Sequence, residues 1–585
     1  VALAADTVHG DLPPLVTQRP FDAVVGNPPW TFVKKVGVPR KRKTGDIQSS
    51  RPRRSPDQEF LWVASRLAGD AGRIGMIMKG SPFFSKDVHA IQSREALLRT
   101  LHPAALVNLS ALRKEGLFPD ATGPALLFFG RCALVDRDDR LLVGSIPWTP
   151  DFKRNGVFHV GPGELKSVPL ARVLRTPAML KATAFGTVRD GWLIEKLERT
   201  LPTLDRLLDE QGLVVRGQGI KIKGDGVERP PAHYYQLDLV TTAAYSPFRL
   251  KPHALKRFEH EWLHRSRQQR SEIFEGPLLL CPKGNQTDAL ELGRYSATVV
   301  EQSVLFNESF FGISFAGKEL SAARVLSAIL NSSLTSFQLA FAGGAWGLER
   351  PTVEPNDLLG LRVPDLGKID TNLLDAVLSA EAAAANAPDD EGLIAALDHA
   401  VCELYGLERD EAILARESVQ RARALLFEGR AQRMLLVARP SSDDLKAYAA
   451  EVVRTVNAYL RARGKRHLEA VIYPRHIAVG NAIDGTPGVD AVRFAMVAGA
   501  PSEVPCVHLG SDAEIARLAA LFRGQVSSEV PPYLNERRQL RIYDENALFI
   551  LKPSEVRYWT RTAGLNDGDA VLADHWIKGL HASVA

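Results

Sequence analysis

Cysteine is scarce and scattered in this chain. The four cysteines lie far apart in the sequence, and no two of them form a CxxC pair. This spacing argues against a disulfide framework and against a cysteine zinc site, and it suits a reducing cytoplasm. The sequence also lacks a signal peptide and an apolar run long enough to cross a membrane. We therefore expect a cytoplasmic globular protein with no membrane segment.

Net charge is also small, at +5 for 585 residues, but it is unevenly placed. Residues 34–54 hold nine basic side chains and one acid, Asp46, so this segment carries +8 and the rest of the chain −3. A dense cationic block favours a polyanion partner, although a solvated loop gives the same pattern. The nine candidate polyanion-binding side chains are Lys34, Lys35, Arg40, Lys41, Arg42, Lys43, Arg51, Arg53 and Arg54.

The most informative stretch is residues 21–30, FDAVVGNPPW. A short apolar run broken by Gly26 predicts a buried strand that ends in a stiff loop, Asn27 to Trp30. In open α/β sheets, ligands bind at the carboxyl ends of the strands. Asn27 and the Pro28 carbonyl offer hydrogen-bond acceptors, and Trp30 offers a flat stacking face. An amino group lying on Trp30 would donate hydrogens to both acceptors. A plain strand followed by a Pro-Pro turn is the other interpretation.

This NPPW motif resembles the catalytic motif of DNA adenine-N6 methyltransferases of the type IIG and type I-like restriction–modification family. The resemblance implies that Asn27, Pro28, Pro29 and Trp30 are catalytic, that S-adenosylmethionine is the cofactor and that double-stranded DNA is the polyanion. It also implies that Asp11 and Phe60 bind the cofactor. Phe118, from LFPDATGPALLFF, would stack on the flipped adenine together with Trp30. A surface turn for Asp11, and core packing for Phe60 and Phe118, remain open.

The flanking pattern predicts a helix beginning near residue 57, strands at 73–78, 105–109 and 125–129, and a helix at 87–101. This order is the second half of a doubly wound sheet with a terminal hairpin. The family's glycine-rich cofactor loop is not found before residue 21. We expect three strands of the sheet to be absent, supplied by an upstream polypeptide or lost by truncation, and we expect residues 21–25 to form an exposed edge. Gly217-Gln218-Gly219 is a weak substitute for the missing loop.

Residues 211–365 resemble the target-recognition domain of the same family in the order of several segments, among them GQGIKIKGDG and GPLLLCPKG. Basic side chains between 249 and 270 are candidate phosphate contacts. The HExxH match at His260–His264 would suit zinc, but we expect a charged helix there and no metal. In the tail, Lys552, Arg557, Tyr558 and Trp559 would contact nucleic acid or a partner, or form a structural edge.

The sequence thus predicts an α/β protein with five parts. These are a partial methyltransferase sheet (1–150), a helical connector (151–210), an α+β recognition domain (211–365), a helical segment (366–430) and a C-terminal α+β domain (431–585). We expect methyl transfer to adenine N6 in DNA within a restriction–modification or anti-phage system. The alternatives are a DNA-recognition subunit that is inactive without a partner chain, and a zinc hydrolase.

Overall fold

The fold is taken from a computed structural model of the chain. It describes residues 20–30, 56–70, 72–86, 88–112, 117, 123–136, 138–222, 227–264, 271–284, 294–344, 352–426, 434, 436–461, 466–473, 489–511, 513–514, 534–536, 539–544 and 546–574.

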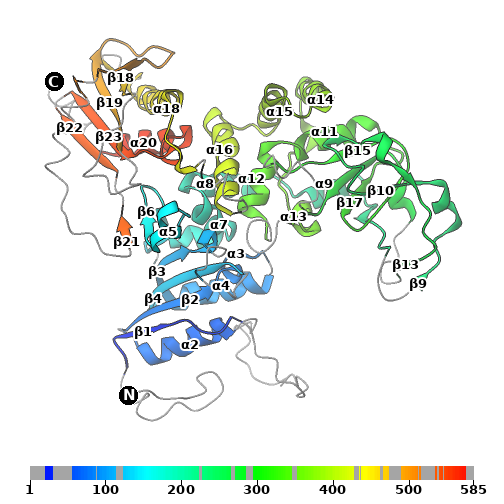
Figure 1. Cartoon of the computed structure of the whole chain (residues 1–585), viewed down its shortest axis with the longest axis horizontal. Coiled ribbons are helices and arrows are strands. Elements are labelled where there is room, and N and C mark those ends of the chain that lie inside the picture. The colour runs from blue at the N-terminus through cyan, green and yellow to red at the C-terminus, as the bar shows by residue number, and fades with distance from the viewer. Residues whose placement is uncertain are drawn as a thin grey trace.

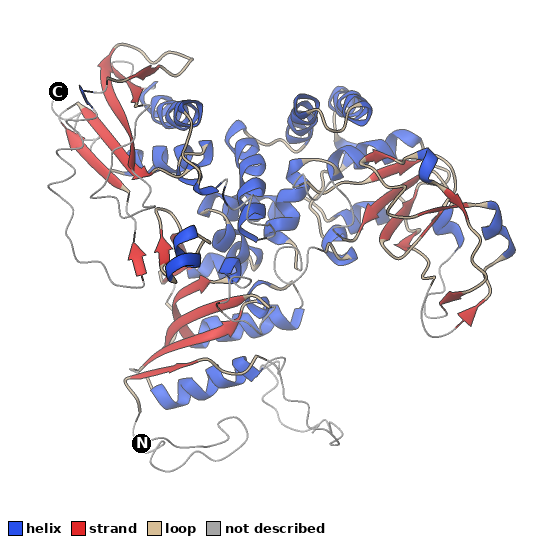
Figure 2. Cartoon of the chain, in the orientation of Figure 1, coloured by secondary structure: helices blue, strands red, loops and turns tan. Residues whose placement is uncertain are grey.

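The protein is a mixed α/β molecule with several mixed sheets, arranged as three lobes around a helical centre (Figures 1 and 2). The lobe nearest the N-terminus holds a six-stranded sheet, the second lobe holds residues 216–314, and the third lobe holds the C-terminal sheet. The central helices pack on one another; they are α7 (Ala178–Phe185), α8 (Val188–Thr200), α12 (Ser333–Ala342) and α16 (Arg409–Leu426). One apolar core runs from the first sheet through these helices into the second lobe.

The first sheet has the strand order β1-β2-β4-β3-β5-β7. Its strands are β1 (Ala23–Gly26), β2 (Arg73–Lys79), β3 (Leu101–Asn108), β4 (Ala125–Cys132), β5 (Arg140–Ser145) and β7 (Leu165–Pro169). The helices that follow its first strands are α2 (Pro56–Ala68), α3 (Ser81–Phe84) and α4 (Val88–Thr100).

The pairing of this sheet confirms the expected strand–helix–strand–helix–hairpin order. β1 and β2 are parallel and are joined through α2, whereas β4 runs antiparallel between β2 and β3. Side chains along β2 alternate between buried and exposed or half-buried positions, because successive residues of a strand point to opposite faces. Its buried residues, Ile74, Met76 and Met78, contribute to the main core.

The sheet also takes in a strand beyond residue 150, where the sequence predicted a domain boundary. This strand is β7, which joins the sheet through β5. β5 pairs in parallel with β3, and β7 pairs antiparallel with β5. Residues 151–210 are largely helical, as expected, but they include β7 and the short strand β6 (Phe158–Val160). The remaining elements of this connector are α5 (Pro150–Asn155), α6 (Leu170–Arg175) and α9 (Leu204–Glu210).

Strand β1 lies at one edge of the sheet. Among the described residues it pairs only with β2, on one side. Val25 is 80% exposed and Phe21 is 43% exposed. The predicted hydrophobic edge is therefore present in the part of the chain that the structure describes.

The second lobe is built from short strands and two helices. A five-stranded sheet with the order β11-β15-β14-β17-β8 packs on α11 (Leu320–Leu330) and α14 (Thr371–Asn386), and a second apolar cluster fills the rest of the lobe. The strands are β8 (Arg216–Gln218), β9 (Val227–Glu228), β10 (Asp238–Val240), β11 (Phe248–Arg249), β12 (Lys256–Arg257), β13 (Leu263–His264), β14 (Leu278–Pro282), β15 (Thr298–Val300), β16 (Leu305–Phe306) and β17 (Phe310–Ser314). The helices are α11 (Leu320–Leu330) and, towards the centre, α13 (Pro355–Leu359).

The helix predicted around His260–His264 is wrong. Residues 256–257 pair with β10 and residues 263–264 pair with β9. The paired residues lie at least 17 positions apart in the sequence (Leu239 and Lys256, 256 − 239 = 17), so the local charge pattern gave no sign of the pairing. Extended backbone also removes the helical spacing that would have placed the two histidines on one face.

The helical segment and the C-terminal domain follow. α14 (Thr371–Asn386) and α15 (Glu391–Leu404) pair with each other. The sequence predicts an apolar stripe of Leu393, Leu397, Val401 and Leu404 on α15, and the last three are buried while Leu393 is half-buried. The C-terminal sheet has the order β20-β18-β19-β23-β22 and its own core. Its elements are α18 (Ser442–Arg461), β18 (Arg466–Ile472), β19 (Val489–Ala498), β20 (Val507–Leu509), β22 (Leu540–Asp544), β23 (Ala547–Pro553) and α20 (Arg561–Ala573).

Two details of this domain differ from expectation. The apolar stretch MLLVA at residues 434–438 predicts a strand, and this prediction is wrong, because Met434, Leu436 and Val437 are helical. The basic and aromatic tail is not a nucleic-acid surface, since Lys552, Arg557 and Trp559 are all buried. The tail instead packs against the connector, and β21 (Leu534–Glu536) pairs with β6.

Among the described helices, none is long and apolar enough by itself to cross a membrane. α11 and α12 meet that criterion only as a pair, by length and composition, with a bend of 59° between them.

Candidate active site

Residues 27–30 lie where the sequence predicted them, at the carboxyl end of a strand. β1 ends at Gly26, which pairs with Met76 of β2. A Cβ atom at Gly26 would lie 3.2 Å from the Met76 sulfur, so glycine lets the two strands approach closely before the loop begins. Because β1 and β2 are parallel, the loop shares its edge of the sheet with the end of β2.

The four motif residues differ in exposure. Asn27 and Pro29 are exposed, Pro28 is buried and Trp30 is half-buried. The Asn27 amide is therefore accessible to a ligand, while Pro28 anchors the loop against the protein. An exposed amide oxygen is an acceptor to which an amino group can donate a hydrogen bond.

Trp30 packs against an apolar cluster formed at the ends of β3, β4 and β5. Leu117 packs against the same cluster. The chain just before Phe118 therefore reaches the same cluster as Trp30, although Phe118 itself lies outside the described residues. The cluster consists of Val107, Leu109, Leu112, Ala125, Ile146, Trp148 and Phe152.

Asp57 supports this edge of the sheet, and the sequence gave it no role. It is fully buried in the first turn of α2, and its carboxylate accepts a hydrogen bond of 2.8 Å from the backbone N–H of Lys79 at the end of β2. The next N–H, that of Gly80, donates to the Pro124 carbonyl at 2.7 Å. The sequence shows that an acid stands at the start of a helix. It does not show that this acid binds the backbone of a strand 22 residues away.

A second buried polar group lies at the end of β3. The Asn108 amide donates to Ser145 Oγ at 3.0 Å and accepts from the Ser110 N–H at 3.1 Å. Ser145 Oγ in turn donates to the Ala184 carbonyl at 2.6 Å. This chain of bonds ties the ends of β3 and β5 to α7, so the loops beside Trp30 rest on a fixed base.

The other predicted site residues divide into two groups. Phe60 lies half-buried on α2, which packs on β1 and β2. Asp11, Phe118 and all nine basic side chains from Lys34 to Arg54 lie outside the described residues. Gly217-Gln218-Gly219 lies in and beside β8 of the second lobe, and a Cβ on Gly219 would lie 2.2 Å from the Phe306 carbonyl. This glycine serves strand packing, and it does not stand next to β1.

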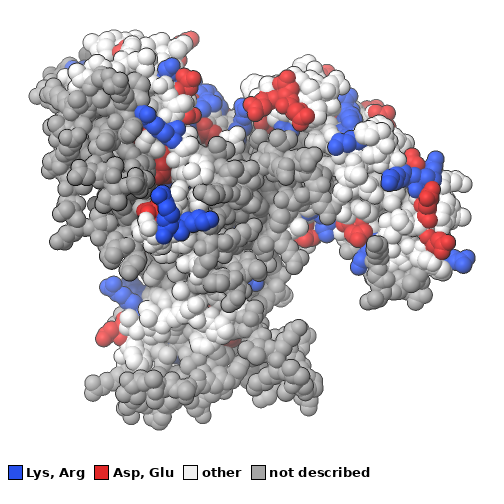
Figure 3. All heavy atoms as spheres, in the orientation of Figure 1, with Lys and Arg blue, Asp and Glu red and all other residues white. Residues whose placement is uncertain are grey.

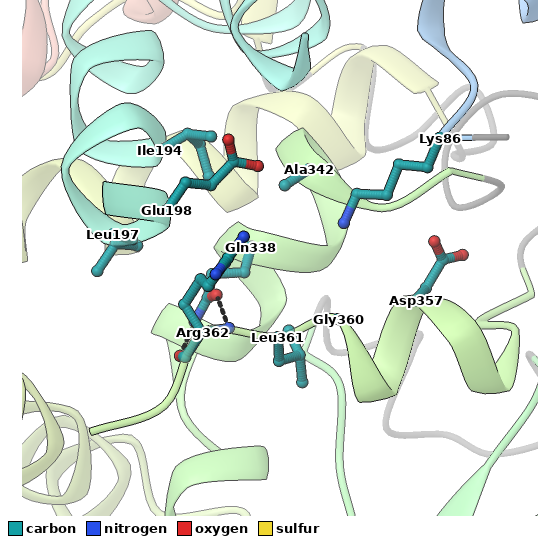
Figure 4. Close-up of a pocket in the computed structure, with 10 residues that line it drawn as sticks. All are labelled: Lys86, Ile194, Leu197, Glu198, Gln338, Ala342, Asp357, Gly360, Leu361 and Arg362. Carbon is teal, nitrogen blue, oxygen red and sulfur yellow. Dashed lines mark hydrogen bonds between the residues drawn. The ribbon is translucent and has the colours of Figure 1, made fainter. Parts of the chain in front are cut away.

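The junction between the first sheet and the second lobe is built from buried charges. Figure 4 shows Lys86, from the loop after α3, reaching towards Glu198 of α8 and Asp357 of α13. Burial lowers the pKa of Lys86, and both acids oppose that shift. Lys181 of α7 donates to the Gly343 carbonyl at 2.6 Å, and Asp357 accepts from the Gly344 N–H at 2.6 Å. These contacts join α7 and α13 to the end of α12.

Lys181 gives this junction a pH dependence. Burial lowers its pKa from 10.5 to about 7, with Lys86 adding to the shift and Asp357 opposing it. Between these values the unfolded chain binds more protons, so stability is expected to rise from about pH 7 to pH 10. In Lys181→Met this contribution is absent. The difference in unfolding free energy between wild type and Lys181→Met, measured by urea unfolding, should therefore change by up to about 1.4 kcal/mol per pH unit. The exposed Lys153→Met is the control, and parallel pH profiles for wild type and Lys181→Met would contradict the assignment.

The basic side chains proposed to contact phosphates have unequal roles. Arg249 donates to Glu381 of α14 at 2.7 Å, and Arg324 donates to the same carboxylate at 2.8 Å. Arg249 is therefore structural. Lys256 and Arg257 are exposed, whereas Arg265, Arg267 and Arg270 lie outside the described residues. Figure 3 shows both signs of charge over the second lobe on the face it displays.

Glu381 is fully buried between these two arginines. Glu381→Ala is expected to lower the free energy of unfolding by about 3 kcal/mol, because it removes a fully buried carboxylate and leaves two partly buried arginines without their counter-charge. Urea unfolding measures the change, with Glu391→Ala, an exposed acid on α15, as the control. A loss no larger than that of the control would mean that the ion pairs contribute nothing to stability.

The zinc interpretation finds no support. Within the described part of the chain, no group of three or more His, Cys, Asp or Glu side chains is placed to hold a metal ion.

No protein-family model matches this sequence, and no curated protein matches it. Among solved structures, the type IIG restriction endonuclease BpuSI is 13% identical, with a TM-score of 0.29 over 64% of this chain and 49% of that chain. The type IIL restriction–modification enzyme MmeI, in complex with DNA, is 11% identical, with a TM-score of 0.37 over 68% of this chain and 57% of that chain. A chain of a type I restriction–modification system is 18% identical, with a TM-score of 0.19 over 27% of this chain and 36% of that chain.

This chain thus covers about half of the first two of these structures. At identities below 20% and TM-scores below 0.5, the likenesses do not by themselves assign an activity to it.

Proposed function

We propose that this chain carries the catalytic loop and the DNA-recognition part of an S-adenosylmethionine-dependent DNA adenine-N6 methyltransferase, acting in a restriction–modification or anti-phage system. The observation that carries the proposal is the accessible Asn27 amide, beside a half-buried Trp30, at the carboxyl end of β1. That geometry offers acceptors and a stacking face at the edge of the sheet where ligands bind.

The proposed chemistry needs only positioning and hydrogen-bond acceptors from the chain. The adenine amino group is inaccessible inside a duplex, so the base must leave the stack. Trp30 then holds the flipped base by stacking, with Phe118 proposed on its other face. Asn27 Oδ1 and the Pro28 carbonyl accept the two N6 hydrogens, which raises the electron density on N6 and aims it for attack. No covalent bond between enzyme and DNA is needed.

S-Adenosylmethionine supplies the electrophilic methyl group in this reaction. We propose that Phe60, which is half-buried on α2, packs on the cofactor's adenine, and that Asp11 is its polar contact. The basic segment from Lys34 to Arg54 follows Trp30 directly in the chain, so we propose that it binds the phosphates around the flipped base.

One observation favours a second form of the proposal. β1 pairs on one side only among the described residues, and Val25 is 80% exposed there. An open hydrophobic edge is the surface that additional strands would cover. In this form the chain recognises DNA, and a further polypeptide that carries the glycine-rich cofactor loop pairs with β1 and completes the cofactor site.

Two binding measurements and one assay separate these forms. Calorimetry of the purified chain with S-adenosylmethionine gives a clear isotherm if the chain builds its own cofactor pocket, and none if a partner completes it. Methyl transfer from labelled S-adenosylmethionine to mixed-sequence duplex DNA is likewise expected only if the chain builds its own cofactor pocket. DNA binding is expected in both forms. A chain that binds no DNA at low ionic strength would overturn both.

A further inference from the structure

A cavity lies between the connector and the C-terminal domain, away from residues 27–30. It has a volume of about 300 Å³, at the lower end of the range for small-ligand sites. The connector contributes Lys166 of β7 and Thr187 before α8, whereas the C-terminal domain contributes Lys552 of β23 and Arg557. Arg421 of α16 completes the basic lining.

The lining carries four basic side chains and a single acid, Asp567. That acid is already engaged inside the C-terminal domain, where it accepts from Lys552 Nζ, from the Tyr448 hydroxyl at 2.6 Å and from Gln539 at 2.9 Å. It therefore has little capacity left to offset the charges of Lys166 and Arg421 across the cavity.

Arg557 is a built part of this wall, because it is 5% exposed. It pairs with Glu555 at 2.7 Å and with Glu164 of the connector at 3.1 Å. Its Nη2 atom is buried without a protein hydrogen-bond partner. A guanidinium held in place with one donor group unused is suited to an anion, which would accept a further charge-assisted hydrogen bond.

Lys166 is a second buried basic group of this wall. Its ammonium group donates to the Thr183 carbonyl at 2.9 Å. Burial and the neighbouring Arg421 lower its pKa to about 7, against the opposing effect of Glu164 and Asp190. An anion between Lys166 and Arg421 would raise that pKa again, so binding should be coupled to proton uptake above pH 7.

The rest of the lining mixes neutral polar side chains with apolar ones. Ser167, Gln539 and Asn566 offer neutral hydrogen-bonding groups, and Gly163 has no neighbouring atom within 4 Å of the position of a Cβ. Neutral groups of this kind bind hydroxyls, while the basic groups bind a phosphate.

We propose that the connector and the C-terminal domain together form a binding site for a small phosphorylated molecule, held at its phosphate by Lys166, Arg421 and Arg557. The site is independent of methyl transfer, and it gives the C-terminal domain a ligand-binding role at its contact with the rest of the chain.

Calorimetry of the whole chain at pH 8 tests the site with three probes: ribose 5-phosphate, inorganic phosphate and phosphate-free ribose. Both phosphate probes are expected to bind saturably with one site per chain, and ribose is expected not to bind. Tighter binding of ribose 5-phosphate than of inorganic phosphate identifies a phosphate ester as the ligand, whereas equal binding identifies free phosphate. Affinity should fall up to about tenfold per pH unit from pH 8 to 9.5, as the linked proton becomes harder to take up.

Arg421→Gln and Lys166→Met should each weaken phosphate binding at least tenfold, while the exposed Lys153→Met leaves it unchanged. Thermal unfolding confirms that each variant is folded. The proposal is overturned by the absence of saturable phosphate binding to wild type, by equal binding of ribose, or by equal loss in Lys153→Met. Competition by duplex DNA for the same site would also overturn it, because the pocket would then hold a DNA phosphate.

Discussion

Replacing Asn27 by alanine is expected to lower methyl transfer at least about 100-fold while leaving DNA binding within twofold of wild type. The side chain supplies one of the two proposed acceptors for the adenine amino group, and loss of one such preorganised hydrogen-bonding group typically costs a factor of about 100 to 1000 in rate. Asn27 is exposed, so its truncation leaves the core intact. The measurement is the single-turnover rate with labelled cofactor, in the preparation that shows transfer for wild type.

The controls for this experiment separate chemistry from folding. Asn27→Asp keeps an acceptor oxygen and should retain more activity than Asn27→Ala. Asn386→Ala removes an exposed amide at the end of α14 and should behave like wild type. If Asn27→Ala kept more than a third of the wild-type rate, the proposed mechanism would be wrong.

Trp30 should have the second largest effect. Trp30→Ala is expected to lower kcat/KM for DNA about 5- to 150-fold, because stacking of one base on an aromatic side chain contributes about 1–3 kcal/mol. Trp30→Phe retains an aromatic face and should lose much less. A fluorescent 2-aminopurine at the target position reports flipping directly, and its signal should decrease in Trp30→Ala but not in Trp30→Phe.

Trp30 also packs against the cluster at the ends of β3 to β5, so a structural loss must be distinguished from a loss of stacking. Trp30→Leu keeps apolar contact with that cluster but lacks a ring face, and it should behave like Trp30→Ala in flipping while remaining as stable as Trp30→Phe. Trp192→Ala, on the exposed side of α8, is the matched control. Normal flipping in Trp30→Leu would reduce Trp30 to a packing residue.

Local patterns in the sequence predicted β1, α2, β2, α4, β3 and β4 because each is encoded by its own hydrophobic spacing. Residues 73–79, for example, alternate in burial along β2 in the manner that their sequence suggests. The loop at residues 27–30 was predictable for the same reason: a short apolar run ends in residues that cannot continue a strand.

Contacts between distant segments were not predictable. The bond from Asp57 to the end of β2, and the ion pairs of Glu381 with Arg249 and Arg324, join residues whose partners depend on the completed fold. In the same way, Arg557 and Trp559 suggested an exposed nucleic-acid surface, but a contact with Glu164 nearly 400 residues earlier buries this tail. Composition identifies which side chains have chemistry to offer, whereas burial decides whether it is used for binding or for structure.

The most direct test is to identify the base that receives the methyl group. Duplex DNA of mixed sequence is incubated with methyl-labelled S-adenosylmethionine and the chain, with any polypeptide that restores cofactor binding added, and the nucleosides are then separated after digestion. Label in N6-methyldeoxyadenosine that disappears in Asn27→Ala is the result that this account predicts. Label in a cytosine product, or in adenine at an equal rate in Asn27→Ala, would contradict it.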